Sequence, residues 1–139
     1  MAVRVRLMEY FHLTLQDRPG AAYGVLRNLR EEGVKLMAFH AYPTGPHTGQ
    51  MVVFPEDSAV LVRAAETLGL DLGHPQQAFV AEADEAAELL EDVHRPCAAA
   101  GINIYATQAM RTEKGCFACL IYVRPADVQP MALVLGLKA

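Results

Sequence analysis

The amino-acid sequence predicts an α+β fold built from two copies of one unit, each with the element order βαββα. Three observations support this prediction. The chain has 139 residues, which is an ordinary length for one domain and too short for a large multi-domain enzyme. Runs with the period of strands are separated by stretches with helical periodicity. The same order of elements then recurs after a shift of 68 residues, which becomes 70 after the second hairpin.

The first copy opens with a strand and a helix. Apolar and polar residues alternate over 10–15, as in a strand with one buried face. The stretch 21–30 places its apolar residues on one helical face and its arginines on the other. Gly33 is expected to end this helix, because glycine readily takes the left-handed conformation found after helices.

A hairpin and a second helix complete the first copy. The strands are expected over 34–42 and 50–54, joined by a segment rich in proline and glycine. The acidic and capping residues of 55–58 precede a helix over 59–68. The first copy thus reads as βαββα.

The second copy repeats this order with few identical letters. A strand at 79–83 matches 11–15, and a strand is expected to open at Gly101 to Ile104. The apolar run 116–123 predicts the last strand, and Pro125 to Asp127 repeat the Pro-x-Asp pattern before the last helix. Pro96 falls inside the first helix of this copy, so a kink or break near Arg95 is expected.

The domain boundaries follow from the repeat, with the first domain over 1–73 and the second over 74–139. No strand is expected after the last helix, and the first copy has only Leu70 to Leu72 to close its sheet. Missing strands leave unpaired sheet edges, which a partner chain could cover.

Composition excludes several classes of protein. The net charge of −4 and the absence of any basic run argue against nucleic-acid binding. No apolar stretch is long enough for a membrane helix, and the charged start of the chain does not resemble a signal peptide, so no membrane association and a cytoplasmic location are expected. Cys116 and Cys119 lie three residues apart on a predicted strand and should point to opposite faces, which favours small buried side chains over a metal or redox site.

No catalytic residue is identified. The sequence has no glycine-rich phosphate loop and no Gly-x-Ser-x-Gly turn, and its acidic cluster at 82–92 lies along a predicted exposed helix. No enzyme activity, cofactor or metal is therefore predicted. One metal alternative stays open, in which His40 with His47 or Cys116 binds a transition metal, although no His-x-His or His-x-x-x-His spacing supports it.

The segment Asp17-Arg18-Pro19-Gly20, between the first strand and helix, is the clearest candidate site. Proline presets the first helical turn and glycine permits a close backbone approach. The helix start then offers free N–H groups and partial positive charge to a carboxylate or other anion. The alternative is an ordinary helix start with Asp17 as N-cap.

These motifs resemble the ACT domain family, small regulatory modules that bind amino acids. The resemblance rests on Asp17-Arg18-Pro19-Gly20, on Gly33-Val34 thirteen residues after Gly20, and on Gly101-Ile102-Asn103-Ile104 in phase with the latter. It covers roughly 8–72 and 76–137. It implies two tandem ferredoxin-like βαββαβ repeats, each an antiparallel sheet with helices on one face, which pair through sheets or helices and hold an effector at a domain interface.

The resemblance also implies a set of ligand-binding residues, in the first loop and at the start of the matching strand in the second copy. They are Asp17, Arg18, Pro19, Gly20, Ala21, Ala22, Asn103 and Ile104. The second loop has Glu85, Ala87 and Glu88 in place of Asp17, Pro19 and Gly20, while the first copy has Lys35 in place of Asn103. The two copies could therefore complement each other in one composite site per chain, or two per symmetric dimer. Gly20→Asp, but not Glu88→Gly, should then abolish binding.

The function expected from the sequence is a non-catalytic regulatory protein. It would bind an amino-acid effector, form a homodimer and act allosterically on a separate enzyme or protein partner. Two alternatives remain: a structural or interaction pair of domains without a ligand, and a metal-sensing ferredoxin-like module.

Overall fold

The computed structural model describes residues 3–84 and 89–137. These form two compact units, which we call unit 1 and unit 2. Unit 2 comprises Glu9–Gln76, and unit 1 combines the first eight residues with residues 77–139. The long first strand β1 (Arg4–Gln16) contributes its start to unit 1 and its remainder to unit 2.

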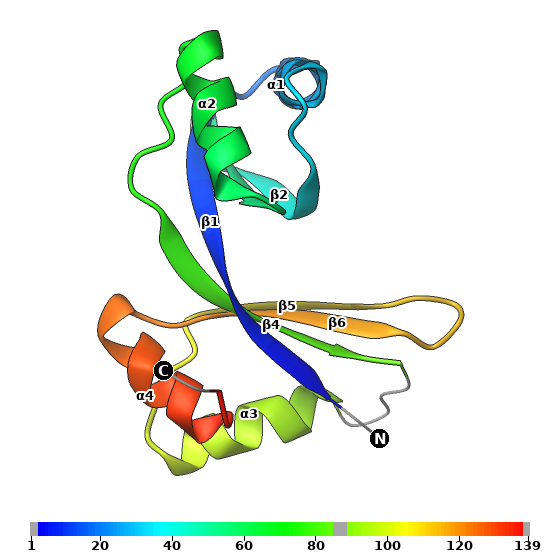
Figure 1. Cartoon of the computed structure of the whole chain (residues 1–139), viewed down its shortest axis with the longest axis vertical. Coiled ribbons are helices and arrows are strands. Elements are labelled where there is room, and N and C mark those ends of the chain that lie inside the picture. Colours follow the sequence, from blue (N-terminus) through cyan, green and yellow to red (C-terminus); the bar gives the residue numbers. More distant parts are fainter. Residues whose placement is uncertain (1–2, 85–88, 138–139) are drawn as a thin grey trace. The chain divides into compact units, whose positions relative to one another are not determined.

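Unit 2 is an antiparallel sheet with two helices on one face (Figure 1). Its other elements are α1 (Ala21–Glu31), β2 (Leu36–Gly45), β3 (Thr48–Pro55) and α2 (Ser58–Leu68). β3 lies between β1 and β2 and is antiparallel to both. The core lies between sheet and helices and includes Phe11, Leu13, Leu29, Met51, Val53 and Leu61.

The helix ends of unit 2 follow the signals in its sequence. The carboxylate of Asp57 accepts a hydrogen bond from the Ala59 amide at 3.0 Å, which caps the start of α2. Gly69 ends α2 with φ +69°, and Gly33 follows α1 with φ +86°. Both angles fall in the left-handed region that glycine adopts without steric cost. The predicted helix end at Gly33 is confirmed, and α2 ends in the same way at Gly69.

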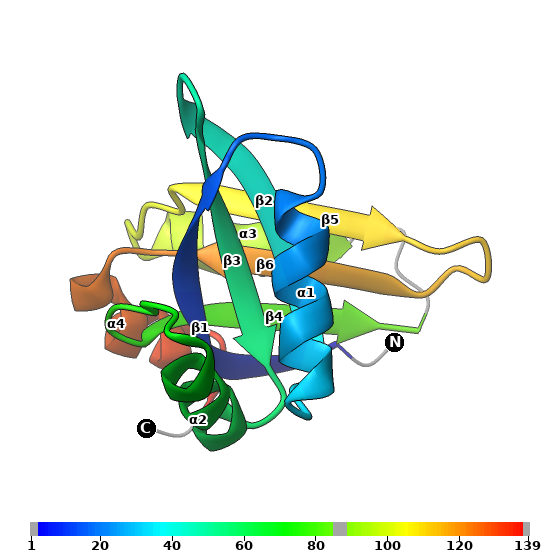
Figure 2. The same ribbon diagram turned by 90° about the horizontal axis from the view of Figure 1, so that it is seen from above.

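Unit 1 repeats the same order of elements. They are β4 (Gln76–Ala83), α3 (Leu89–Ala99), β5 (Ala106–Arg111), β6 (Phe117–Tyr122), the 3₁₀ turn η1 (Pro125–Asp127) and α4 (Val128–Val134). β6 is antiparallel to both β4 and β5, and the strand order is β1-β4-β6-β5 (Figures 1 and 2). The α+β class with antiparallel strands, predicted from the sequence, is confirmed.

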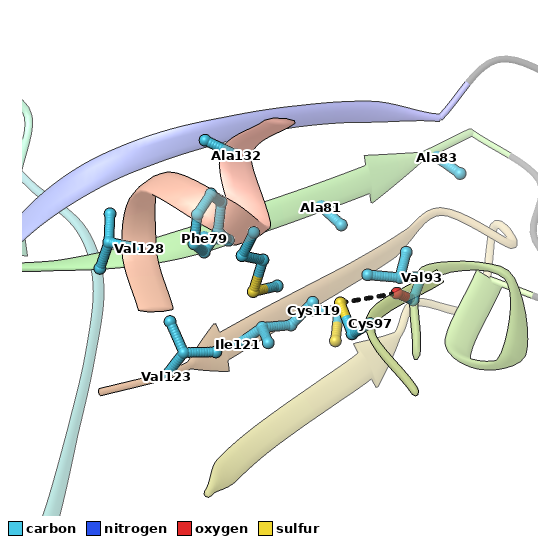
Figure 3. Close-up of a cluster of buried hydrophobic side chains, with 11 residues drawn as sticks. Phe79, Ala81, Ala83, Val93, Cys97, Cys119, Ile121, Val123, Val128 and Ala132 are labelled. Atoms are coloured by element: carbon cyan, nitrogen blue, oxygen red, sulfur yellow. Dashed lines mark hydrogen bonds between the residues drawn. The ribbon is translucent and has the colours of Figure 1, made fainter. Parts of the chain in front are cut away.

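The core of unit 1 lies between its sheet and its two helices. Phe79 and Ile121 are fully buried and point from β4 and β6 toward the helices (Figure 3). Cys97 on α3 lies in this core, and its thiol donates a hydrogen bond to the Val93 carbonyl at 3.5 Å. Cys119 is also buried, whereas Cys116 is exposed. Cys116 precedes β6, so the prediction of opposite strand faces is not tested, and the expectation that both thiols are buried is wrong for Cys116.

The start of the chain supplies a strand to unit 1. Val3, Val5 and Leu7 pack against the core of unit 1, while the intervening arginines point outward. Arg4 contacts Asp84 at 3.2 Å and Arg6 contacts Glu82 at 3.3 Å. The hydrogen bond and charge of Asp84 raise the pKa of Arg4. Residues at the start of the chain thus occupy a position beside β4 that a partner chain was expected to cover.

Two expectations for unit 1 are wrong: a break in its first helix and a middle strand that opens at Gly101. The helix α3 continues through Pro96, so there is no break near Arg95, and the alternative of a kink stays a prediction. Proline removes only one helical hydrogen bond, and burial of the neighbouring Val93 and Cys97 offsets that loss. The strand expected to open at Gly101 to Ile104 begins later, at Ala106, because the preceding residues form the turn after α3. Glu85, Ala87 and Glu88, on which the degenerate second loop was predicted, lie outside the described residues.

Candidate functional site

The clearest hollow near a predicted site lies in unit 2, where β1 ends and α1 begins. It has a volume of about 190 Å³. We call it the loop cavity. Its walls come from the end of β1, the loop that follows, the first turn of α1 and the hairpin strands β2 and β3. Its lining residues are Leu15, Gln16, Asp17, Arg18, Ala21, Ala22, Ala41, Tyr42, Pro43, Gly49 and Gln50.

The helix start beside this cavity has no side-chain cap. The N-cap of α1 is Gly20, with φ +85° and ψ −7°, and no side chain accepts a hydrogen bond from the first turn. The alternative that made Asp17 the N-cap is therefore wrong. The first bond of the helix runs from the Gly24 amide to the Gly20 carbonyl at 2.9 Å. The amides of Ala22 and Tyr23 thus precede the first helical hydrogen bond, as in any uncapped helix start.

Hydrogen bonds of the backbone and of side chains hold the loop between β1 and α1 in place. The Asp17 amide donates to the His47 carbonyl at 2.9 Å, which ties the loop to the tip of the β2–β3 hairpin. The Arg18 Nε donates to the Gln16 Oε1 at 2.8 Å. The Ala21 amide donates to the Arg18 carbonyl at 3.3 Å and closes a turn before the helix. These hydrogen bonds therefore hold the backbone of the loop in a defined position beside the cavity.

The chemistry of the loop cavity suits a small zwitterion. The uncapped amides and the partial positive charge at the start of α1 attract a carboxylate, and the guanidinium of Arg18 adds further positive charge. The Asp17 carboxylate offers an acceptor for an ammonium group. Both charged side chains are exposed, so their contribution to affinity is screened by water.

Five cavity residues on the β2–β3 hairpin, Ala41, Tyr42, Pro43, Gly49 and Gln50, were not foreseen from the sequence. Tyr42 and Pro43 on β2 lie opposite Gln50 and Gly49 on β3, and Gly49 also pairs with Leu15 on β1. A Cβ on Gly49 would meet the Tyr42 carbonyl oxygen at 3.3 Å, so a side chain would crowd this wall. The hairpin itself was predicted, but its pairing beside β1 was not.

The other residues predicted to bind the ligand do not line the loop cavity. Pro19 and Gly20 shape the loop but do not line the cavity. Asn103 and Ile104 belong to unit 1, in the irregular segment between α3 and β5. Asn103 is exposed, whereas Ile104 packs against the core of unit 1.

Two of the four histidines of unit 2, His12 and His40, lie on its sheet. His12 and His40 both pair with Val52, from opposite sides of β3. Partial burial lowers the pKa of both imidazoles, and the charge of His12 lowers that of His40 further. The shifts favour the neutral imidazole of both residues. Among residues 3–84 and 89–137, no three His, Cys, Asp or Glu side chains gather as a metal site would require.

No helix in the described part of the chain is long and apolar enough to cross a membrane.

Comparison with known proteins finds relatives by structure. No protein-family model and no curated protein matches the sequence. Protein BT0572 from Bacteroides thetaiotaomicron has a TM-score of 0.77 at 15% identity, over 94% of this chain and 88% of that one. The ligand-free regulatory subunit of aspartate kinase from Thermus thermophilus has a TM-score of 0.61 at 16% identity, over 97% and 95%. The corresponding subunit from Thermus flavus has a TM-score of 0.61 at 19% identity, over 96% and 93%.

These similarities concern the fold, because the identities are low. They extend over most of each chain, from 88% to 97%, so they are not limited to one short motif. The chain therefore has the fold of regulatory subunits of this kind, and its resemblance to ACT-domain proteins is confirmed at the level of the fold.

Proposed function

We propose that this protein is a non-catalytic regulatory module that binds an amino acid in the loop cavity. The observation that carries the proposal is the lining of that cavity. Asp17, Arg18, Ala21 and Ala22, which the resemblance to ACT domains marked as ligand-binding, line one hollow beside an uncapped helix start. A zwitterion needs donors for its carboxylate and an acceptor for its ammonium group, and this segment offers both.

The proposal includes a tandem organisation. The repeated order of elements supports two ferredoxin-like ACT repeats, with sequence boundaries at 1–73 and 74–139. We further propose that Asn103 and Ile104 also contact an effector, as the resemblance to ACT domains implies. An effector that prefers one packing of the domains would shift the population toward it. A separate enzyme or protein partner would respond to that shift, so the regulation is allosteric and acts between chains.

A melting screen over the twenty amino acids tests for the effector. A ligand at about 100 times its dissociation constant adds roughly 2.7 kcal/mol to the free energy of unfolding. A clear rise in melting temperature with one amino acid is the expected result. A flat screen would favour the structural or interaction pair of domains without a ligand, and a rise with divalent metals alone would favour a metal sensor.

Gly20→Asp is expected to abolish binding of the amino acid that the screen identifies. It places a carboxylate at the N-cap of α1, where it would occupy the free amides and repel the ligand's carboxylate. Gly33→Asp is the matched control, because Gly33 has φ +86° at the other end of the same helix and open space around it. Both variants carry a strain of about 1–3 kcal/mol and the same added charge. Calorimetric titration should show binding lost in Gly20→Asp and retained in Gly33→Asp; equal affinities would refute the proposed site.

We also propose a homodimer, formed through the outer strand β5 of unit 1. All six residues of β5 are exposed, and Met110 keeps 70% of its surface in contact with solvent. An exposed outer strand has backbone groups free to pair with a second strand. Met110→Lys is expected to shift sedimentation equilibrium toward the monomer, because lysine on an outer strand opposes such pairing. Leu133→Lys on α4, where Leu133 is 67% exposed, is the control and should leave the mass unchanged. A monomeric parent protein would contradict the proposal.

A further inference from the structure

A second cavity in unit 2 lies apart from the loop cavity, between α2 and the segment that follows it. Its volume is about 350 Å³, and we call it the α2 cavity. Residues 70–75, which connect α2 to β4, have no regular secondary structure. An irregular connection covers the sheet less completely than a strand does, which leaves room under α2. The volume falls within the range of small-molecule sites, from about 300 Å³ upward.

The inner wall of the α2 cavity is apolar. Phe11 on β1, Ala65 on α2 and Leu72 in the connection are buried and line it. Val62 also lines it and keeps 39% of its surface exposed. Leu70 and Pro75 complete the apolar part. A hydrocarbon chain of a few carbons could therefore leave water against this wall, at a gain proportional to the area buried.

The charged groups of the α2 cavity all have one sign. Glu9, Glu66 and Asp71 line it, and neither lysine nor arginine does. Among the described residues, none of these three carboxylates forms an ion pair. Asp71 is exposed, and its Oδ1 accepts a hydrogen bond from the Gly73 amide at 3.0 Å. Carboxylates around a low-dielectric wall concentrate a negative potential that attracts cations.

The arrangement distinguishes an organic cation from a metal ion. A metal site would need at least three ligating side chains that converge, and the described residues include no such group. Carboxylates spread around an apolar wall instead suit a ligand with charge at one end and hydrocarbon at the other. We propose that the α2 cavity binds a small organic cation, an ammonium group on a short hydrocarbon chain. This is a second site, independent of the amino-acid site proposed above.

Calorimetric titration with n-pentylammonium chloride tests this inference directly. Binding should be saturable, and in NMR spectra it should shift the resonances of Val62 and Leu72. 1-Pentanol, with the same chain but no charge, and methylammonium, with the charge but no chain, should both bind more weakly. If 1-pentanol bound as tightly as n-pentylammonium, or if no resonance around the α2 cavity shifted, the inference would be overturned.

Two variants separate charge from shape. Glu66→Gln removes one carboxylate and is expected to weaken n-pentylammonium binding by about fivefold. Glu56→Gln, at an exposed carboxylate outside the cavity, is the matched control and should leave affinity unchanged. Val62→Trp fills the cavity from the partly exposed side and should eliminate binding while the melting temperature stays close to that of the parent. Unchanged affinity in both Glu66→Gln and Val62→Trp would place the bound amine elsewhere and refute the proposal.

Discussion

A chain that begins at residue 9 is expected to lose the stable fold of unit 1. The deleted segment carries Val3, Val5 and Leu7, which pack on the core of unit 1, and it removes the strand beside β4. Three half-buried aliphatic side chains together contribute about 3 kcal/mol to the free energy of unfolding. The deletion also exposes the backbone edge of β4, which favours aggregation. Hydrogen exchange should show β4 and β6 losing protection, while the core strand β3 of unit 2 stays protected.

A matched variant separates apolar packing from surface charge. Arg4→Ala with Arg6→Ala removes the ion pairs to Asp84 and Glu82, but those side chains are largely exposed, so only a small loss of stability is expected. Val5→Asp keeps both arginines and should reproduce most of the effect of the deletion. If the double arginine variant were as unstable as the truncated chain, the strand would hold unit 1 by charge rather than by burial.

Phe79→Ala is expected to cost about 3–5 kcal/mol in the free energy of unfolding. Phe79 is fully buried on β4, among side chains from β6, α3 and α4 (Figure 3). Its removal leaves a cavity that backbone elements on both sides cannot close. Urea denaturation followed by circular dichroism should show the loss in the transition of unit 1, with hydrogen exchange on β6 assigning it to that unit.

The control for Phe79→Ala is Leu133→Ala. Leu133 is apolar but 67% exposed on α4, so its truncation should change the free energy of unfolding by no more than about 0.5 kcal/mol. A loss below about 1 kcal/mol for Phe79→Ala would mean that the two helices do not pack tightly on β4. Comparable losses in the two variants would contradict the assigned core.

Much of unit 2 could be predicted from its sequence because the signals there are local. The left-handed glycines after α1 and α2 and the Asp57 cap act within one or two turns of the chain. Strand alternation around Phe11 and Leu13 likewise depends only on neighbouring residues. Local rules could also fail when packing opposed them. Pro96 does not break α3, since burial of Val93 and Cys97 outweighs one missing hydrogen bond.

The candidate site also combines local features that the sequence predicts with tertiary features that it does not. The loop from Asp17 to Ala22 was identified from proline and glycine spacing, which sets the backbone before a helix. Its cavity walls on Tyr42, Pro43, Gly49 and Gln50 depend on β3 pairing with β1, and strand order is not encoded in any single segment. The prediction that Asp17 caps the helix was wrong, because the N-cap is Gly20, three residues further along the chain.

The sequence by itself determined the order of strands and helices, the turns and the loop that carries the proposed amino-acid site. These follow from side-chain period, capping and glycine or proline preferences, all of which act over a few residues. Only the tertiary structure decided which strands are neighbours, and hence that residues 3–8 complete the sheet of unit 1 rather than leave its edge to a partner. The physical reason is that burial of Val3, Val5 and Leu7 depends on a surface formed more than seventy residues later in the chain.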